Sequence, residues 1–398
     1  MPRAFLIVMD SVGAGGAPDA DHFFNGTIPD TGANTLGHIA EMRAAEGQPL
    51  HMPVLDGLGL GAAVRLASGA RMPGFDAKPE SIWGAAEAVS PGKDTPSGHW
   101  ELAGLPVPWE WTVFPDTNPA FPETLTTEIC RLAGTEGILG NCHASGTAII
   151  EAEGAAHLKT GWPICYTSAD SVVQIAAHET AFGLGRLLVL CQGLAPLVHD
   201  MRVGRVIARP FTGSDGRFTR TGNRRDYALE PPGPTLCDWV TQAGRPVHAV
   251  GKIGDIFAGR GISDTAKGRD STLMQALQRL VGNAEDGSLT FANFVEFDSV
   301  YGHRRDWAGY AAALEWFDAA VPALLAALKP DDLMLFTADH GNDPTWPGTD
   351  HTRERVPLVG TGPYSGQLGL VGFVDVAATL AAHLGVAAPS DAPGRSLI

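Results

Sequence analysis

The sequence has few of the features that mark disulfide-rich, secreted or membrane proteins. Its five cysteines are scattered and form no C-x-x-C pair, which argues against a disulfide framework or a paired-cysteine metal site. This pattern is typical of reduced thiols and predicts a cytoplasmic protein. No apolar run reaches the roughly 18 residues needed to cross a membrane, and no basic segment followed by an apolar one marks a signal peptide.

Positive charge is also scarce. The chain has 28 Lys and Arg residues against 44 Asp and Glu, a net charge of −16. This balance argues against nucleic acid or an anionic membrane surface as the main partner. An anionic small-molecule substrate would therefore require local clusters of basic side chains.

The length of 398 residues exceeds one ordinary hydrophobic core and predicts two domains. Strand and helix patterns alternate near both ends of the chain, which predicts an α/β core. The alternating strand and helix pattern is interrupted between a Pro/Trp-rich stretch near residue 108 and a Pro-rich stretch after residue 230. We interpret 108–230 as an inserted α+β cap domain, with 1–107 and 231–398 together forming the core domain.

Three apolar runs each predict a strand that leads to a carboxylate, and histidines follow two of these runs. The carboxylates are Asp10, Asp298 and Asp339, and the histidines are His303, His340 and His351. Side chains at the carboxyl ends of strands face the crevice in which open α/β sheets bind ligands. A mixed oxygen and nitrogen ligand set suits Mn, Fe or Zn better than Ca. Six such ligands exceed the needs of one ion, so we expect two ions.

Residues 90–101 follow a strand expected at 81–89 and contain Thr95 and Pro96. One interpretation is structural, with Thr95 as a helix N-cap and Pro96 as the first helical residue. A chemical interpretation uses the same position, because a helix N-terminus stabilises a phosphoryl group and a metal-bound hydroxyl becomes a nucleophile. In that case Lys93 would help to hold a phosphate.

Arginine is concentrated in the expected cap. Six arginines fall within residues 202–224 of this acidic chain: Arg202, Arg205, Arg209, Arg217, Arg220 and Arg224. Arginines are most often a solvated surface, but this density is what an anionic substrate would require. In the second part of the core, Lys252 follows a strand expected at 247–250.

Other prominent residues have structural interpretations. Apolar residues spaced three and four apart between Tyr310 and Leu328 predict a core helix, which Pro322 should kink. We expect His38 to be a packed or capping residue and His383 to be structural.

Six strings of residues carry a resemblance to a known family: 92–101, 166–171, 204–211, 220–224, 250–255 and 348–353. On these motifs the chain resembles the phosphopentomutases, within the alkaline-phosphatase-like superfamily of metal-dependent phosphoryl-transfer enzymes. The likeness covers nearly the whole chain and implies an alkaline-phosphatase-like core, a central sheet flanked by helices. Glu296 and Asn342 depart from the family pattern, in which we expect Asp and Cys, but neither is an expected ligand.

The resemblance implies two Mn²⁺ ions and a nucleophile that becomes phosphorylated. It assigns Asp10, Asp339 and His340 to one ion, assigns Asp298, His303 and His351 to the other, and makes Thr95 the bridging nucleophile. It makes Ser168, Asp170, Arg205, Arg220 and Lys252 the substrate-facing set. The implied reaction interconverts ribose 1-phosphate and ribose 5-phosphate, or the 2-deoxyribose pair. A bisphosphate such as glucose 1,6-bisphosphate or ribose 1,5-bisphosphate would prime Thr95, and the cap would exclude water from the phosphoenzyme.

Three alternatives remain open from the sequence. A cofactor-independent phosphoglycerate mutase and a plain phosphatase could use the same metals, although the former carries a serine nucleophile and the latter has less need of a basic cap. A catalytically dead regulatory protein should have lost a ligand or the nucleophile, and this chain retains them all.

Overall fold

The computed structural model describes residues 1–168, 170–214 and 216–398. The chain divides into two compact units. The core unit consists of Met1–Pro108 and Pro231–Ile398, and the cap unit is the segment between them, Trp109–Glu230.

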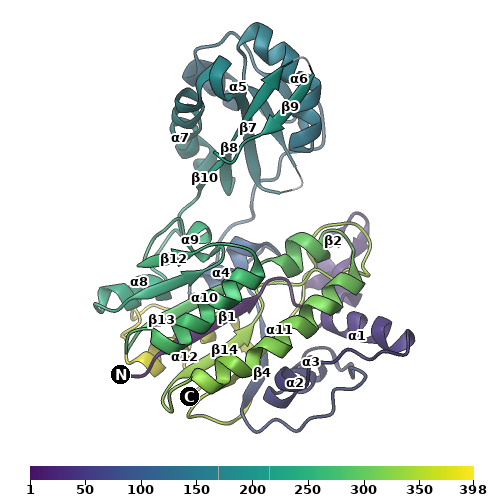
Figure 1. The fold of residues 1–398 in the computed structure, drawn as a ribbon, viewed down its shortest axis with the longest axis vertical. Helices are drawn as coiled ribbons and strands as arrows, with labels where there is room; N and C mark the ends of the chain where they lie inside the picture. Colours follow the sequence, from purple (N-terminus) through teal and green to yellow (C-terminus); the bar gives the residue numbers. More distant parts are fainter. Residues whose placement is uncertain (169, 215) are drawn as a thin grey trace. The chain divides into compact units, whose positions relative to one another are not determined.

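The core unit is built on an eight-stranded sheet (Figure 1). In spatial order the strands are β12 (Asp264–Ala266), β11 (Val247–Val250), β13 (Leu289–Phe294), β1 (Ala4–Met9), β14 (Leu333–Thr337), β15 (Val356–Thr361), β4 (Ile82–Glu87) and β16 (Gly366–Gly372). Only β15 among these strands runs antiparallel to its neighbours. The carboxyl ends of β11, β13, β1, β14 and β4 therefore meet at one edge of the sheet.

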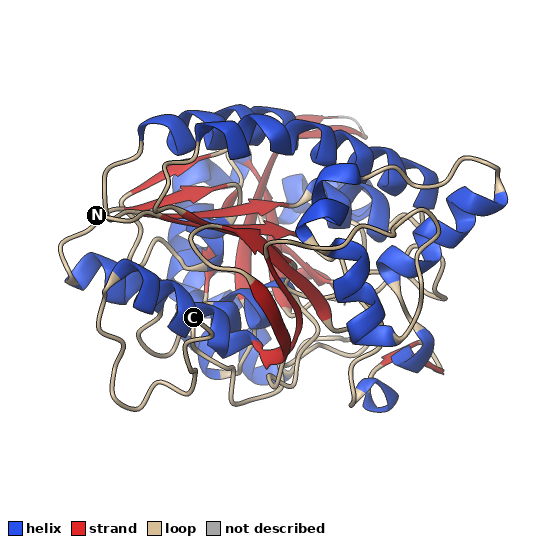
Figure 2. Ribbon diagram, turned by 90° about the horizontal axis from the view of Figure 1, so that it is seen from below, coloured by secondary structure: helices blue, strands red, loops and turns tan. Residues whose placement is uncertain are grey.

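Burial on both faces explains the composition of the central strands. Every residue of β1, β13 and β14 is buried, because helices cover both faces of the sheet (Figure 2). In one group of helices, α1 (Thr35–Ala45), α2 (Pro53–Leu58) and α10 (Asp270–Asn283) each pack on α11 (Trp307–Ala327). A second group is α4 (Thr95–Leu102), α8 (Leu236–Gln242), α9 (Ile253–Ile256) and α12 (Phe373–Leu384), while α3 (Leu60–Ser68) packs on β4 and β15.

Helix α11 contains the apolar stripe expected from the sequence. Tyr310, Leu314, Phe317 and Leu324 are all buried, and the helix continues through Pro322. Two helices of the described residues, Glu179–Asp200 and Trp307–Ala327, are long and apolar enough to cross a membrane by length and composition alone. A core helix of a globular domain passes the same test, and each of these helices packs buried apolar residues into its own unit.

A short hairpin projects from the N-terminal part of the core unit. It consists of β2 (Phe24–Asn25) and β3 (Ile28–Pro29), between the 3-10 turns Ala20–His22 and Asp30–Gly32. Asp30, which follows the hairpin, is fully buried.

The cap unit has its own mixed sheet. Its strands are β10 (Arg225–Ala228), β8 (Arg205–Ser214), β7 (Val172–His178), β6 (Ile164–Thr167) and β5 (Leu139–His143) in spatial order, with β9 (Arg217–Arg220) beside β8. Helices α5 (Glu123–Ala133) and α7 (Leu184–Asp200) contribute to one apolar cluster, and α6 (Gly146–Thr160) contributes to another. A π-helical turn, Glu179–Gly183, precedes α7.

Candidate active site

The loops after β1, β13 and β14 bring acidic and imidazole side chains together. Donor atoms of Asp298, His303 and His351 lie within 4.8 Å of one another, and so do those of Asp10, Asp298 and His340. The rings of His340 and His351 stack with their centroids 4.0 Å apart. Asp298 belongs to both groups, so the two groups form one continuous cluster.

Asp339 joins this cluster through His340. Its Oδ2 lies 3.2 Å from Nε2 of His340, and the same nitrogen is 3.7 Å from Oδ1 of Asp10. The backbone N–H of Ser11 donates to Oδ1 of Asp339 at 3.0 Å. Ser11 has a φ of 67°, in the left-handed region, which costs a non-glycine residue about 1 to 3 kcal/mol. The chain adopts this conformation directly after Asp10, where it orients an N–H toward the cluster.

The carboxylates of the cluster perturb one another. Burial raises the pKa of Asp10 to about 7, and the nearby Asp339 and Asp298 add to the rise. Burial also opposes ionisation of Asp298, but His351 and His303 outweigh it and hold the pKa of Asp298 well below its usual range. Burial lowers the pKa of His340, yet Asp339 and Asp10 overcome this and raise it to about 10. A bound cation would relieve the repulsion among the three carboxylates.

Buried polar atoms without partners test whether metal ions fit this cluster. Oδ1 of Asp10, Oδ2 of Asp339 and Nε2 of His351 are buried and have no hydrogen-bond partner among the described residues. Such atoms are costly unless another group binds them. All three belong to residues of the ligand set expected from the sequence, and their oxygen and nitrogen chemistry suits a transition metal. The residues present therefore fit metal binding.

Thr95 lies at the start of α4 and faces the cluster. Its Oγ1 is 3.2 Å from Nε2 of His340. The structural interpretation of Thr95 was wrong by one residue, because Asp94 is the N-cap and accepts from the backbone N–H of Ser97 at 3.0 Å. Thr95 is the first helical residue, so its hydroxyl is not used for capping.

The position of α4 depends on a close backbone approach. A Cβ at Gly98 would lie 2.2 Å from the backbone oxygen of Asp339, so only glycine fits. One turn after Thr95, the fully buried His99 lies 3.1 Å from Oδ2 of Asp339, and its Nδ1 donates to the Thr95 carbonyl at 2.9 Å. Its other nitrogen accepts from Asn293, whose amide also donates to Asp10 at 2.7 Å. We did not expect roles for His99 and Asn293 from the sequence, although the helical spacing of four between Thr95 and His99 was a usable signal.

Asp298 does not lie at a strand tip, contrary to expectation. Strand β13 ends at Phe294, and Asp298 is in a π-helical turn, Phe297–Gly302. Asn342 donates to Oδ1 of Asp298 at 2.7 Å, which helps to hold the carboxylate in place. Single π-turns often occur at functional sites.

Comparisons with known proteins agree with this geometry. The chain matches the Metalloenzyme superfamily over residues 2–388. It is 55% identical to the phosphopentomutases of Rhizobium meliloti (strain 1021), over 415 residues, and of Methylobacterium sp. (strain 4-46), over 413 residues, covering 100% of both chains in each case.

The chain belongs to the phosphopentomutase family. It is therefore an enzyme, and the expected α/β class with a central sheet flanked by helices is confirmed. Among solved structures, a Leishmania mexicana phosphoglycerate mutase aligns over 99% of this chain and 97% of that chain, with 14% identity and a TM-score of 0.49. The superfamily match and the ligand groups together support dependence on a metal.

The two lysines predicted to bind substrate differ in their surroundings. In this phosphopentomutase-family chain, Lys93 donates to the Phe24 carbonyl at 2.9 Å and to Asp30 at 3.0 Å, and it lies 3.4 Å from Asp350. Its ammonium is thus engaged by protein groups. Lys252 is exposed at the carboxyl end of β11, at the edge where the ligand cluster forms.

The remaining predicted residues of the phosphopentomutase site belong to the cap unit. Arg205 begins β8 and lies 3.9 Å from the exposed Asp170, Ser168 follows β6, and Arg220 is exposed at the end of β9. The structure thus brings Arg205 and Asp170 within ion-pair distance of each other.

Three of the arginines noted in the sequence of the cap unit surround Tyr166, a residue that the sequence did not single out. The hydroxyl of Tyr166 is buried and has no hydrogen-bond partner among the described residues. Burial raises its pKa, whereas Arg209, Arg220 and Arg224 oppose the rise. A Cβ added at Gly146, the first residue of α6, would lie 2.5 Å from this hydroxyl and 3.6 Å from Nη1 of Arg220. Guanidinium groups, a helix N-terminus and a free hydroxyl together favour an anion.

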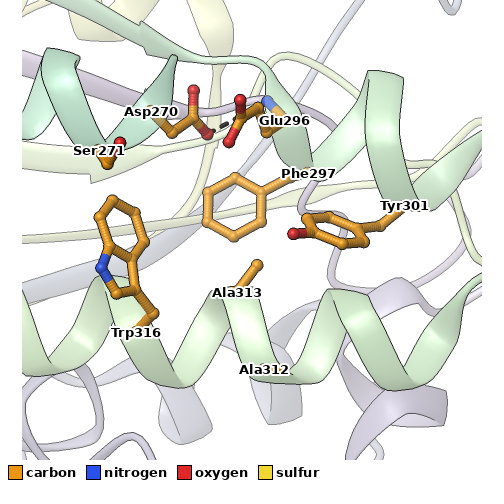
Figure 3. A pocket seen from close by; sticks show the side chains of 8 residues that line it. All are labelled: Asp270, Ser271, Glu296, Phe297, Tyr301, Ala312, Ala313 and Trp316. Carbon is orange, nitrogen blue, oxygen red and sulfur yellow. Dashed lines mark hydrogen bonds between the residues drawn. The ribbon is translucent and has the colours of Figure 1, made fainter.

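A pocket of about 210 Å³ lies in the core unit beside the turn that carries Asp298. Figure 3 shows Asp270 and Glu296 on one side of it and Trp316 of α11 on the other. The backbone N–H of Glu296 donates to Asp270 at 3.1 Å, and burial, with Glu296 adding to it, raises the pKa of Asp270 to about 7. None of its lining residues is an expected ligand, so the pocket is distinct from the phosphopentomutase ligand cluster.

Proposed function

We propose that this enzyme interconverts ribose 1-phosphate and ribose 5-phosphate, or the 2-deoxyribose pair, through a phosphothreonine at Thr95. The observation that carries the proposal is the Thr95 hydroxyl at the start of α4, 3.2 Å from Nε2 of His340 and beside the ligand cluster. A hydroxyl that neither caps its helix nor is buried away from solvent is available to react.

Asp10, Asp339 and His340 would hold one Mn²⁺ ion, and Asp298, His303 and His351 the other. When bound, two such ions neutralise charge on the transferring phosphoryl group and lower the pKa of a coordinated hydroxyl. In the structure Asp298 lies within reach of both His351 with His303 and Asp10 with His340, which supports two adjacent ions.

The chain's own residues supply position and charge. Thr95 is the first residue of α4, so a phosphoryl group on it would lie at the N-terminus of the helix, where the helix dipole favours an anion. His99 fixes the Thr95 backbone through its bond to the Thr95 carbonyl. We assign Lys252, Arg205 and Arg220, with Ser168 and Asp170, to binding of the sugar phosphate.

The reaction consists of two phosphoryl transfers, and each is accompanied by the loss or gain of one proton on the sugar. The phosphoryl group leaves Oγ1 of Thr95 for the C1 hydroxyl of ribose 5-phosphate, which gives up its proton, and ribose 1,5-bisphosphate forms. The C5 phosphoryl group then passes to Oγ1 of Thr95, the C5 oxygen takes up a proton, and ribose 1-phosphate leaves. A sugar bisphosphate such as glucose 1,6-bisphosphate primes the first cycle.

The enzyme's setting is proposed on the same basis. Its five cysteines are free thiols, which supports a cytoplasmic location. Its net charge of −16 supports a small phosphosugar, rather than nucleic acid or an anionic membrane, as its partner.

Intact-mass analysis tests the nucleophile directly. Mn²⁺-loaded protein incubated with glucose 1,6-bisphosphate should gain one phosphate, and peptide mapping should locate it on Thr95. The Thr95→Ala variant should gain none. Interconversion of the pentose phosphates without any protein-bound phosphate would overturn the phosphothreonine mechanism.

A further inference from the structure

Arg353 uses all five of its guanidinium N–H groups. Nε and Nη2 donate to the carboxylate of Asp19 at 3.0 and 2.8 Å, Nη2 also donates to the Ala88 carbonyl at 2.8 Å, and Nη1 donates to the carbonyls of Ser90 and Gly92 at 3.0 and 2.8 Å. The residue is only 3% exposed. A buried guanidinium with every donor satisfied holds its partners in a fixed geometry.

Three of these acceptors belong to the segment that leads to the nucleophile. Residues 88–94 connect β4 to α4 and end directly before Thr95. Glu101 of α4 also holds this nucleophile segment, because it accepts from the N–H groups of Val89 and Ser90, both at 2.8 Å. Arg353 thus binds carbonyl groups of the segment, and Glu101 binds its N–H groups.

Arg353 also belongs to the loop that carries His351. The backbone N–H of Arg353 donates to Oδ2 of Asp30 at 3.0 Å, and the same oxygen accepts from Lys93 at 3.0 Å. Asn25 donates to Oδ1 of Asp30 and to the His351 carbonyl, both at 3.0 Å. The hairpin therefore connects the His351 loop with the nucleophile segment at a second point.

We propose that Arg353 is a positioning residue that holds the nucleophile segment against the His351 loop and so keeps the Thr95 hydroxyl at a fixed position beside the ligand cluster. Asp30 and Lys93 form the second connection of the same clamp, and Lys93 acts there as a tie between segments rather than as a phosphate ligand. The catalytic part of this inference rests on the proposed role of Thr95. The mechanical part rests on the contacts alone.

The expected kinetic effect follows from position. A displacement of about 1 Å at a reacting group can lower the rate by about 100-fold without touching substrate. Loss of the clamp should therefore lower kcat and the rate of Thr95 phosphorylation, and leave KM for ribose 5-phosphate nearly unchanged.

Arg353→Met and Arg353→Lys test the clamp, with Arg355→Met as the matched control. Arg355 lies two residues further along and donates to the Glu87 side chain and the Ala67 carbonyl, both at 2.9 Å, so it anchors no carbonyl of the nucleophile segment. The first readout is hydrogen exchange of residues 88–95 in the metal-free protein. The second is single-turnover phosphorylation of Thr95 by glucose 1,6-bisphosphate, measured beside kcat and KM.

In Arg353→Met we expect exchange at Val89 and Ser90 to rise at least about tenfold, and kcat to fall by about tenfold or more with KM within about twofold. Arg353→Lys should restore part of both, since a lysine keeps the charge but not the forked geometry. Arg355→Met should match the parent at these amides. Asp19→Asn is a second test in case Arg353→Met fails to fold. It removes the charge of a partly exposed carboxylate that binds the guanidinium, so both readouts should shift in the same direction as in Arg353→Met, but by less.

Equal exchange at Val89 and Ser90 in the parent, Arg353→Met and Asp19→Asn would overturn the clamp, whatever the activities. Raised exchange with unchanged phosphorylation kinetics would overturn the positioning role. A parent that never phosphorylates Thr95 would refute the proposed function instead, and the exchange data would still decide the mechanical part.

Discussion

The hydroxyl oxygen of Thr95 lies 3.2 Å from Nε2 of His340, although 245 positions separate the two residues. Thr95 follows β4 and His340 follows β14, and both strands pair with β15. Because β4 and β14 run in the same direction on either side of β15, their carboxyl ends share one edge of the sheet. The strand order therefore creates the contact between Thr95, the proposed nucleophile, and the ligand cluster.

Replacing Thr95 by alanine should abolish mutase turnover and leave folding and metal content nearly unchanged. Asp94 supplies the N-cap, so the substitution removes no capping bond, and its effect on stability should stay within about 0.5 kcal/mol. Steady-state assays, thermal unfolding and elemental analysis together measure this. Thr241→Ala is the control, since that hydroxyl bonds to carbonyls of its own helix. Turnover of Thr95→Ala within tenfold of the parent would refute the nucleophile assignment.

Strands with two covered faces were the most predictable part of the fold. A strand buried on both faces reads as an unbroken apolar run, which is why β1, β11 and β14 could be located from the sequence almost to the residue. Asp10 and Asp339 follow directly from these runs. Local sequence could not decide between Asp94 and Thr95 as N-cap, because both residue types are good caps.

The connections that complete the site could not be predicted, because they are set by contacts distant in sequence. No local pattern indicates the π-turn that carries Asp298 four residues beyond β13. The roles of His99, Asn293 and Arg353 likewise depend on which loops meet at the sheet edge. The sequence alone does not distinguish a buried arginine such as Arg353 from a surface arginine, because its five acceptor atoms come from distant parts of the chain.

Asp339→Asn and His351→Ala should each lower bound Mn²⁺ and activity. Each change removes an atom of the proposed ligand set, Oδ2 of Asp339 or Nε2 of His351, that is buried and makes no hydrogen bond to the described residues, so a bound ion would lose a ligand. Elemental analysis after dialysis against a fixed free Mn²⁺ concentration measures the loss. Metal removal should also loosen the site, because the three carboxylates repel one another without cations.

His383→Ala is the matched control for these variants. His383 is also buried, but its ring nitrogens contact the Tyr364 hydroxyl at 3.2 Å and the Arg3 carbonyl at 3.1 Å. We expect it to lose some stability and no metal. Equal metal content in all three variants would show that the cluster does not bind the ion.

The His38–Asp343 contact should make stability depend on pH. The hydrogen bond from His38 to Asp343, 2.5 Å long, raises the pKa of His38 above 6.5, with burial opposing and Glu354 and Glu41 adding to the rise. A histidine with a raised folded pKa stabilises fully below its unfolded pKa, and this stabilisation is lost as the pH rises through the folded pKa. His38→Ala should therefore destabilise the protein more at about pH 6 than at about pH 9.

Denaturant unfolding of the parent and variant at both pH values checks the difference. His22→Ala is the control. His22 is largely exposed, and its 3.9 Å distance from Asp21 is too long for a hydrogen bond. A His38→Ala penalty that is the same at both pH values, or larger at the higher one, would contradict the assigned charge pair.

Arg205→Ala and Arg220→Ala separate mutase chemistry from simple phosphate release. If these arginines donate charge-assisted hydrogen bonds to the sugar phosphate, each is worth about 1.5 to 3 kcal/mol, and its loss should lower mutase turnover by at least about tenfold. Leakage of phosphate to water from phosphorylated Thr95 should stay constant or rise, because the arginines hold the sugar and not the phosphothreonine. Arg217→Ala, an exposed arginine on the same strand as Arg220, should change neither rate. A parallel fall in leakage and turnover would mean that Arg205 and Arg220 support the fold or the phosphothreonine itself, and the proposed division of roles would be wrong.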